Sequence, residues 1–201
     1  MPTTTVAILL FDEVEVLDFC GPFEVFSVAS RVAMRDKRTT EPPFQVVGVA
    51  RSREPVRARG GLVMLPHQAI GDALPVDVLI VPGGVVDQPL ADAATIAWIK
   101  TMAGKASLTA SVCTGAFLLA KAGLLAGRRA TTHWEDAAAL RSGFPDVTVV
   151  EGVPWVDEGA IVTSGGISAG IDMSLHLVER LLDRRAAEAT ARQMEYRWNR
   201  L

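Results

Sequence analysis

The 201-residue chain has few of the features that would assign it at once to a function class. Its only cysteines are Cys20 and Cys113, too few for a disulfide framework or a cysteine-based metal cluster. We therefore expect two free thiols, no metal and no cofactor. A net charge of −3 at pH 7, without a block of like charges, offers no electrostatic attraction for nucleic acid.

Long apolar runs are also missing. The first apolar run, residues 6–11, is interrupted by Asp12 and has no basic flank, so it predicts neither a secretory signal nor a membrane span. With 49% hydrophobic residues the chain can bury a sizeable core, and its length favours one domain over residues 1–201. These features predict a compact cytoplasmic protein that does not associate with membranes.

What the sequence does contain is an alternation of strand-like and helix-like stretches. It predicts a mostly parallel sheet covered by helices on both faces, in which ligands bind beyond the carboxyl ends of the strands. The expected strands are residues 5–11, 44–49, 63–65, 76–81, 108–112, 130–132, 147–150, 154–156 and 160–164. The expected helices are residues 21–32, with Pro22 in the first turn, 92–103, 114–122, 168–182 and 186–198.

Cys113 lies where the apolar run 108–112 meets a helical pattern. Residues 111–115, Ser-Val-Cys-Thr-Gly, have the small-any-nucleophile-any-glycine form of a nucleophile elbow. A helix that starts at Thr114 would direct its positive dipole end at the sulfur and favour the thiolate near neutral pH. The alternative is a buried, inert cysteine.

Asp18 lies a few residues after the first predicted strand, among apolar neighbours that would desolvate its carboxyl group and raise its pKa. A partly protonated carboxylic acid could donate a hydrogen bond to the sulfur and later move a proton. The alternative is that Asp18 only caps the following helix.

Three further positions are candidates for the same edge of the sheet. Gly83 and Gly84 follow a buried strand, and with the Thr114 amide they could form an anion-stabilising pocket, or simply a turn. His133 is the histidine nearest a recognisable motif, and we favour a structural, hydrogen-bonded role for it over a catalytic base. His176 falls in an apolar helical stripe and is predicted to lie in the core or an interface.

Several motifs together resemble the ThiJ/PfpI, or DJ-1/PfpI, superfamily. They include the stretch 111–115, Arg-Ala-Thr-Thr-His-Trp at 129–134, Thr-Ser-Gly-Gly-Ile-Ser-Ala-Gly-Ile-Asp at 163–172 and the early Leu17-Asp18 with Gly21-Pro22. The similarity covers essentially the whole chain. Within the superfamily it is greatest to the isonitrile hydratase branch and to the ligand-binding halves of AraC-type regulators.

The resemblance implies a flavodoxin-like three-layer sandwich, usually a homodimer. It makes Cys113 the nucleophile, Asp18 the acid that reaches it, and Thr114 the residue that follows the nucleophile in the hydratase branch. Gly84 falls where the family has its oxyanion-binding backbone. Expected pocket walls are Phe19, His133, Trp134 and Ile167. Because other branches carry histidine where this chain has Thr114, a Cys-His-acid peptidase triad is not expected.

The activity that this resemblance implies is the addition of water to an isonitrile. The substrate is a small electrophilic molecule, and the product is an N-substituted formamide formed through a cysteine thioimidate. Three alternatives stay open: glyoxalase-like chemistry on 2-oxoaldehydes, a non-enzymatic ligand-sensing domain, and a redox sensor in which Cys113 is oxidised to sulfinic acid and held by Asp18.

Overall fold

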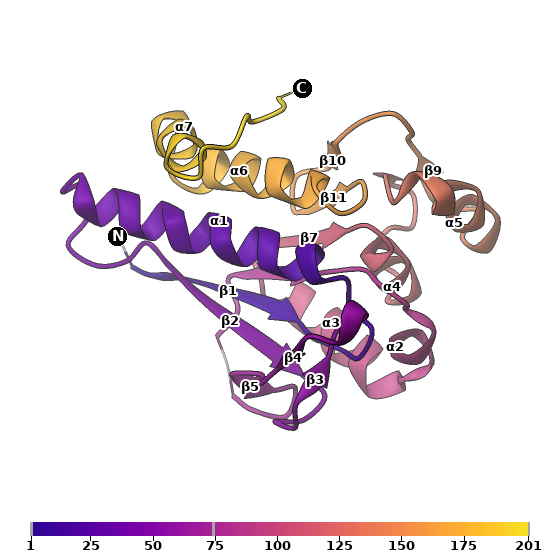
Figure 1. The fold of residues 1–201 in the computed structure, drawn as a ribbon. Coiled ribbons are helices and arrows are strands. Elements are labelled where there is room, and N and C mark those ends of the chain that lie inside the picture. The colour runs from indigo at the N-terminus through magenta and orange to yellow at the C-terminus, as the bar shows by residue number, and fades with distance from the viewer. Residues whose placement is uncertain (1, 74, 201) are drawn as a thin grey trace.

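A seven-stranded sheet forms the centre of the molecule in the computed structural model, which describes residues 2–73 and 75–200 (Figure 1). The strand order is β10-β11-β7-β6-β1-β2-β5, and every neighbouring pair is parallel except β10 with β11. The strands are β1 (Thr4–Leu9), β2 (Phe44–Ala50), β5 (Gln68–Ala69), β6 (Val78–Val81), β7 (Leu108–Val112), β10 (Trp155–Asp157) and β11 (Ile161–Ser164).

Helices cover both faces of this sheet, as the alternating pattern predicts. Three helices pack against one another on one face, namely α1 (Val16–Arg35), α6 (Ala169–Leu181) and α7 (Arg184–Gln193). Three others pack together on the opposite face, namely α2 (Asp87–Ala91), α3 (Ala93–Ala103) and α4 (Gly115–Lys121). The remaining helices are α5 (Ala137–Gly143) and the short 3-10 turns η1 (Arg59–Gly61) and η2 (Trp134–Asp136).

The core consists of two apolar clusters, one on each face of the sheet. Along β1, Val6 and Ile8 belong to the cluster under α1, whereas Ala7 and Leu9 belong to the other cluster. This is the period-2 alternation of a strand that is buried on both sides. The predicted three-layer α/β sandwich is thus confirmed. Within the described residues, no helix combines the length and apolar character needed to cross a membrane.

Two short strand pairs lie outside the main sheet. β3 (Val56–Arg57) and β4 (Val63–Met64) form an antiparallel hairpin, while β8 (Arg129–Ala130) and β9 (Thr148–Val149) pair in parallel. The predicted strands at 130–132 and 147–150 correspond to this second pair, although each is shorter than expected. The chain that leaves β8 leads directly into the segment 131–136, which borders the candidate site described below.

Helix α1 begins at Val16, so the prediction that it opens at Gly21-Pro22 was wrong. Pro22 lies inside the helix, where its missing N–H deprives the Asp18 carbonyl of the usual partner four residues on. Burial of Phe19, Val25 and Phe26 on the same helix offsets this loss. Asp18 therefore lies in the first turn of a 20-residue helix, not in a loop.

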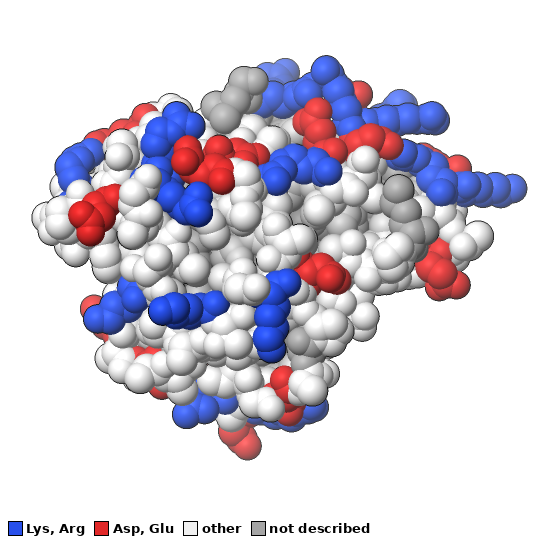
Figure 2. Space-filling model, turned by 180° about the vertical axis from the view of Figure 1, so that it is seen from behind, with Lys and Arg blue, Asp and Glu red and all other residues white. Residues whose placement is uncertain are grey.

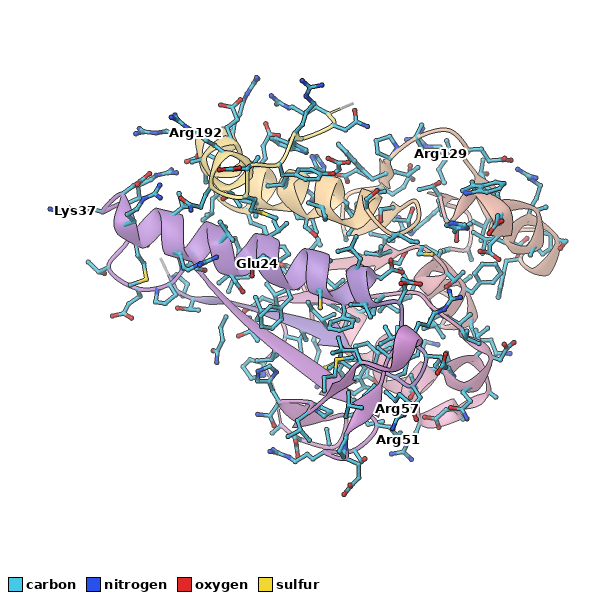
Figure 3. The ribbon with its side chains drawn as sticks, in the orientation of Figure 1. Glu24, Lys37, Arg51, Arg57, Arg129 and Arg192 are labelled. Atoms are coloured by element: carbon cyan, nitrogen blue, oxygen red, sulfur yellow. The ribbon has the colours of Figure 1, made fainter. Side chains whose placement is uncertain are left out.

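Charges of both signs are mixed over the surface. On the face that Figure 2 shows, basic and acidic side chains lie next to one another and a broad uncharged area separates the groups. The basic side chains labelled in Figure 3 come from separate segments of the chain; Lys37, two residues after α1, and Arg129 in β8 lie on opposite sides of the view. On this face, therefore, no single sign of charge dominates.

Candidate active site

Cys113 occupies the sharp corner between β7 and α4. Its φ of 56° lies in the left-handed region, which side chains other than glycine rarely adopt. The corner closes tightly, because a Cβ at Gly115 would lie 2.1 Å from the Val81 carbonyl oxygen. The Cys113 amide donates to the Gly165 carbonyl at 3.2 Å, and the Thr132 hydroxyl donates to the Cys113 carbonyl at 2.9 Å. The fold thus fixes Cys113 in the geometry of a nucleophile elbow.

A cavity of about 230 Å³ opens at this corner. Cys113 is 7% exposed and contributes to the cavity wall. The wall also contains four residues that the sequence singled out, namely Gly84, Thr114, His133 and Ile167. It contains four charged residues that sequence reasoning missed, because each lies on a loop or short element without a motif of its own: Glu15, Arg59, Glu135 and Asp136.

Asp18 lies beneath the cavity, fully buried beside Cys113. The Gly83 amide donates to its Oδ2 at 3.0 Å, while its Oδ1 has no partner with hydrogen-bond geometry among residues 2–73 and 75–200. Burial, helped by the nearby charge of Glu15, raises the pKa of Asp18 to about 7, against the lowering effect of the Gly83 amide. This carboxyl group can therefore take up and release a proton near neutral pH.

The Cys113 thiol is held in its neutral form. Burial first, and then the charge of Asp18, raise the pKa of Cys113 to about 12, although the Thr114 and Ile167 amides lower it. The prediction of a thiolate near neutral pH was wrong, because two turns of α4 do not outweigh desolvation and a neighbouring carboxylate. A reaction at this sulfur needs a base, and the group in contact with it is Asp18.

The two glycines after β6 serve a different purpose from the predicted anion pocket. The Gly83 amide donates to Asp18, and the Gly84 amide donates to Thr114 Oγ1 at 2.9 Å. Because both amides already donate to side chains, neither is free to donate a hydrogen bond to the sulfur. The backbone amides that do lower the pKa of Cys113 belong to Thr114 and Ile167.

Thr114 is bound to the loop after β6 through its side chain. Its Oγ1 accepts from the Gly84 amide and donates to the Gly84 carbonyl, both at 2.9 Å. With both interactions made to one residue, the hydroxyl ties the nucleophile corner to the neighbouring strand end.

The other predicted wall residues separate into three places. Ile167, with a φ of 51°, and His133 line the Cys113 cavity. Trp134 is 76% exposed and lines an adjoining cavity instead. Phe19 is buried in the same core cluster as Cys113 and is not among the residues that line the 230 Å³ cavity.

The remaining histidines have structural partners. His67 Nδ1 accepts a hydrogen bond from the Gly48 amide at 2.9 Å. His176 lies 2.7 Å from Asp157 Oδ2, and its ring stacks on Trp155 with centroids 5.3 Å apart. His176 is only partly buried, and its pairing with a carboxylate was not foreseen from the apolar stripe around it.

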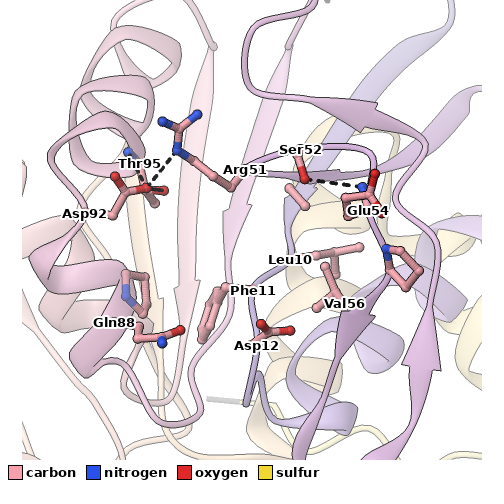
Figure 4. Close-up of a pocket in the computed structure, with 13 residues that line it drawn as sticks. Leu10, Phe11, Asp12, Arg51, Ser52, Glu54, Val56, Gln88, Asp92 and Thr95 are labelled. Atoms are coloured by element: carbon pink, nitrogen blue, oxygen red, sulfur yellow. Dashed lines mark hydrogen bonds and ion pairs between the residues drawn. The ribbon is translucent and has the colours of Figure 1, made fainter.

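A larger cavity of about 360 Å³ lies elsewhere, beyond the ends of β1 and β2 (Figure 4). Its walls include Phe11, Arg51 and Asp92, and an ion pair of 3.2 Å joins Arg51 to Asp92. Asp92 also accepts hydrogen bonds from the Ala94 and Thr95 amides at the start of α3, so its carboxylate is already hydrogen-bonded and ion-paired. The walls of this cavity contain neither cysteine nor histidine, so no thiol or imidazole is available there, and the smaller cavity at Cys113 is the candidate active site.

No set of three or more His, Cys, Asp or Glu side chains in the ranges 2–73 and 75–200 is arranged to hold a metal ion. The groups in position to react at the cavity are the thiol and the carboxyl group just described.

The fold and the cysteine corner together define a class of protein, and comparison with known families agrees with it. Residues 4–180 match the DJ-1/PfpI family, and the chain belongs to that family. Its relatives include the isonitrile hydratase of Pseudomonas putida, which is 36% identical over 194 residues, 95% of this chain and 78% of the relative.

The chain is also similar to a solved structure of the same family and to a transcriptional regulator. The crystal structure of a ThiJ/PfpI family protein from Pseudomonas syringae superimposes with a TM-score of 0.84 at 30% identity, covering 100% of this chain and 78% of that one. The HTH-type transcriptional regulator GbdR of Pseudomonas aeruginosa is 28% identical over 96% of this chain, which spans 50% of the regulator's length. Enzymes and regulators therefore share this domain.

Proposed function

We propose that the protein is a cysteine-dependent isonitrile hydratase, which adds water to an isonitrile to give an N-substituted formamide. The observation that carries the proposal is the fully buried Asp18 carboxyl group beside the Cys113 thiol, where burial raises the pKa of both groups. An isonitrile needs both a sulfur nucleophile and a proton at its terminal carbon, and this pair supplies both.

In the first step the pair adds S–H across the terminal carbon. Asp18 takes the proton from Sγ and delivers it to that carbon while the bond between sulfur and carbon forms. The product is a thioimidate, R–N=CH–S–Cys. Because Asp18 passes the proton on, a free thiolate need not accumulate, which suits a thiol whose pKa is raised to about 12.

In the second step water adds to the thioimidate carbon. Asp18 takes a proton from the water and passes it to the nitrogen, which gives a tetrahedral R–NH–CH(OH)–S–Cys. The carbon–sulfur bond then breaks, the hydroxyl proton returns to Sγ through Asp18, and R–NH–CHO leaves. The sum is one isonitrile and one water converted to one formamide.

This chemistry suits the cavity better than peptide hydrolysis. Amide cleavage requires an acid that protonates an amine leaving group, usually a histidine bonded to the cysteine. Here the residue after the nucleophile is Thr114, whose hydroxyl is bound to Gly84. Isonitrile hydration has no amine leaving group.

We further propose that the enzyme works as a homodimer in the cytoplasm. The β3–β4 hairpin exposes Leu62 and Val63, and Leu65 directly after β4 is exposed too; the same hairpin carries Arg59 into the wall of the Cys113 cavity. A second copy would cover these apolar side chains. A reducing compartment would keep Cys20 and Cys113 as thiols.

The direct test is incubation of the purified protein with cyclohexyl isonitrile, and separately with methylglyoxal, followed by mass-spectrometric analysis. We expect N-cyclohexylformamide to form with multiple turnovers and methylglyoxal to remain unchanged. Conversion of methylglyoxal alone would replace the proposal by glyoxalase-like chemistry.

A second candidate is a ligand-sensing domain, which the similarity to GbdR over 96% of this chain favours. Turnover of neither compound would support it.

A further inference from the structure

The cavity of about 360 Å³ beyond the ends of β1 and β2 has an apolar floor. Leu10, Ala50 and Val56 are buried there, and Phe11 and Pro89 complete the apolar part of the wall. These side chains come from the ends of β1 and β2, from β3 and from α2, so regular elements fix their positions. In a parallel α/β sheet, ligands bind beyond the carboxyl ends of the strands, and an apolar floor with a few polar groups is typical of a small-molecule site.

The charges that are left unpaired in the wall are negative. Among the described residues that line the cavity, Arg51 is the one base, and its Nε is already ion-paired with Asp92 Oδ2 at 3.2 Å. The other charged wall residues, Asp12 and Glu54, are both acidic and exposed. Neither forms a salt bridge within residues 2–73 and 75–200. A ligand that enters the cavity therefore meets a negative potential.

Asp12 is held at the edge of the apolar floor with one oxygen to spare. Its Oδ1 accepts a hydrogen bond from the Arg57 amide at 2.8 Å, which fixes the carboxylate in place. Its Oδ2 has no protein donor in the part of the chain that the structure describes. In the view of Figure 4, Asp12 lies between Phe11 and Val56, so a cationic group at Oδ2 would have its hydrocarbon part next to apolar side chains.

An anionic ligand fits this cavity poorly. Asp92 accepts from Thr95 Oγ1 at 2.6 Å as well as from Arg51, so the basic group is neutralised by a carboxylate that is itself firmly held. A bound anion would lie near that carboxylate and near Asp12 and Glu54, where like charges repel it.

We propose that this cavity is a second ligand site, which binds a small amphiphilic cation. An aromatic ring or a hydrocarbon group of similar size would lie on the apolar floor, with a primary ammonium group at Asp12. Apolar burial supplies most of the affinity, and the carboxylates select the charge. No described residue lines both this cavity and the Cys113 cavity, so the proposal does not depend on the hydratase function.

NMR titration of the isotope-labelled wild type with phenethylamine tests the site directly. Hydrocinnamate and phenethyl alcohol are the matched compounds, because they carry the same ring with a negative charge or with none. We expect phenethylamine to shift the amides of Phe11, Arg51 and Gln88 saturably and, at low salt, to bind about tenfold or more tightly than hydrocinnamate. Equal or tighter binding of hydrocinnamate, the absence of saturation, or shifts confined to Thr114 and Ile167 at the Cys113 cavity would overturn the proposal.

Asp12→Asn separates the charge from the shape of the site, since the amide oxygen can still accept from Arg57. The variant should bind phenethylamine about three- to tenfold more weakly and phenethyl alcohol within about twofold of the wild type. Asp146→Asn is the control, because Asp146 is an exposed aspartate that does not line the cavity, and it should bind both compounds as the wild type does. Equal losses for amine and alcohol in Asp12→Asn would count against charge selection, and the wild-type titration decides the question even if this variant does not fold.

Discussion

Two carboxylates of this protein each lie against a group capable of chemistry, and their surroundings give them opposite properties. Asp18 touches Cys113 and is fully buried, no cation of the described residues 2–73 and 75–200 lies beside it, and its pKa is raised to about 7. Asp157 touches His176 and also Arg180, whose Nη1 lies 2.9 Å from its Oδ2. Although burial pushes the pKa of Asp157 up, His176, the Gly159 amide and Arg180 lower it overall.

A carboxylate next to a titratable side chain is therefore not enough to define a catalytic pair. His176, the Gly159 amide and Arg180 together hold Asp157 in its ionised form, so that corner ties β10 to α6. Asp18 lacks such a cation, and its unpartnered Oδ1 leaves room for a proton.

Cys113→Ala should abolish hydration, with a loss in kcat of at least about 1,000-fold, because the covalent intermediate cannot form. Formamide production by the purified variant is the measurement. Retention of more than a tenth of the activity would show that the thiol takes no part in the chemistry.

Asp18→Asn should lower kcat by about 100- to 10,000-fold, because proton transfer to carbon and from water is lost. The amide keeps the shape of the side chain and can still accept from Gly83. Wild-type turnover in this variant would assign the proton transfers to another group.

The same substitution should stabilise the fold in alkaline solution. The folded pKa of Asp18 lies above the unfolded value of 3.8, so the wild type loses stability as pH rises from about 4 to about 7. Asp18→Asn should therefore raise Tm by about 5 °C at pH 8 and change it little at pH 4. Thermal unfolding at both pH values measures this, and a Tm difference of the same size at each would contradict the raised pKa.

Asp18→Asn should also make Cys113 more acidic, since the charge of Asp18 raises the pKa of the thiol. At pH 8 the rate of Cys113 alkylation by iodoacetamide should rise several-fold over the wild type. Mass spectrometry of the Cys113 peptide follows the reaction, with Cys20→Ala in both proteins so that the second thiol does not consume reagent. An unchanged or slower rate would mean that the two groups are not coupled.

Asp157→Asn provides the contrast. It should leave kcat within about twofold of the wild type and lower the free energy of unfolding by about 1 kcal/mol, because a charged hydrogen bond is lost. Denaturant unfolding and the formamide assay measure the two effects. A large loss of activity without a loss of stability would place Asp157 in the reaction.

Much of the fold could be predicted from the sequence. Strand β7 matches its predicted bounds, since a short apolar run before a small-residue corner leaves few alternatives. The start of α1 was misplaced because Pro22 usually marks a first turn, and only tertiary packing shows that the helix tolerates it. Short elements such as β5 and α2 have too few residues for a periodic pattern.

The site was predictable in its parts but not in its electrostatics. The motif around Cys113 indicated a nucleophile, and apolar neighbours indicated a raised pKa for Asp18, which is the direction found. The protonation state of the thiol could not be read from the sequence, since it depends first on how deeply Cys113 is buried and then on its proximity to Asp18. Arg59 and Glu15 come to the cavity from a hairpin and a helix start, and nothing local marks them.

The missing partner of Asp18 Oδ1 has a consequence for anyone who improves this protein by directed evolution. A screen that rewards heat resistance or expression yield alone will enrich uncharged replacements at position 18, and the survivors will be robust but inert. Catalysis must therefore be kept in the screen from the first round.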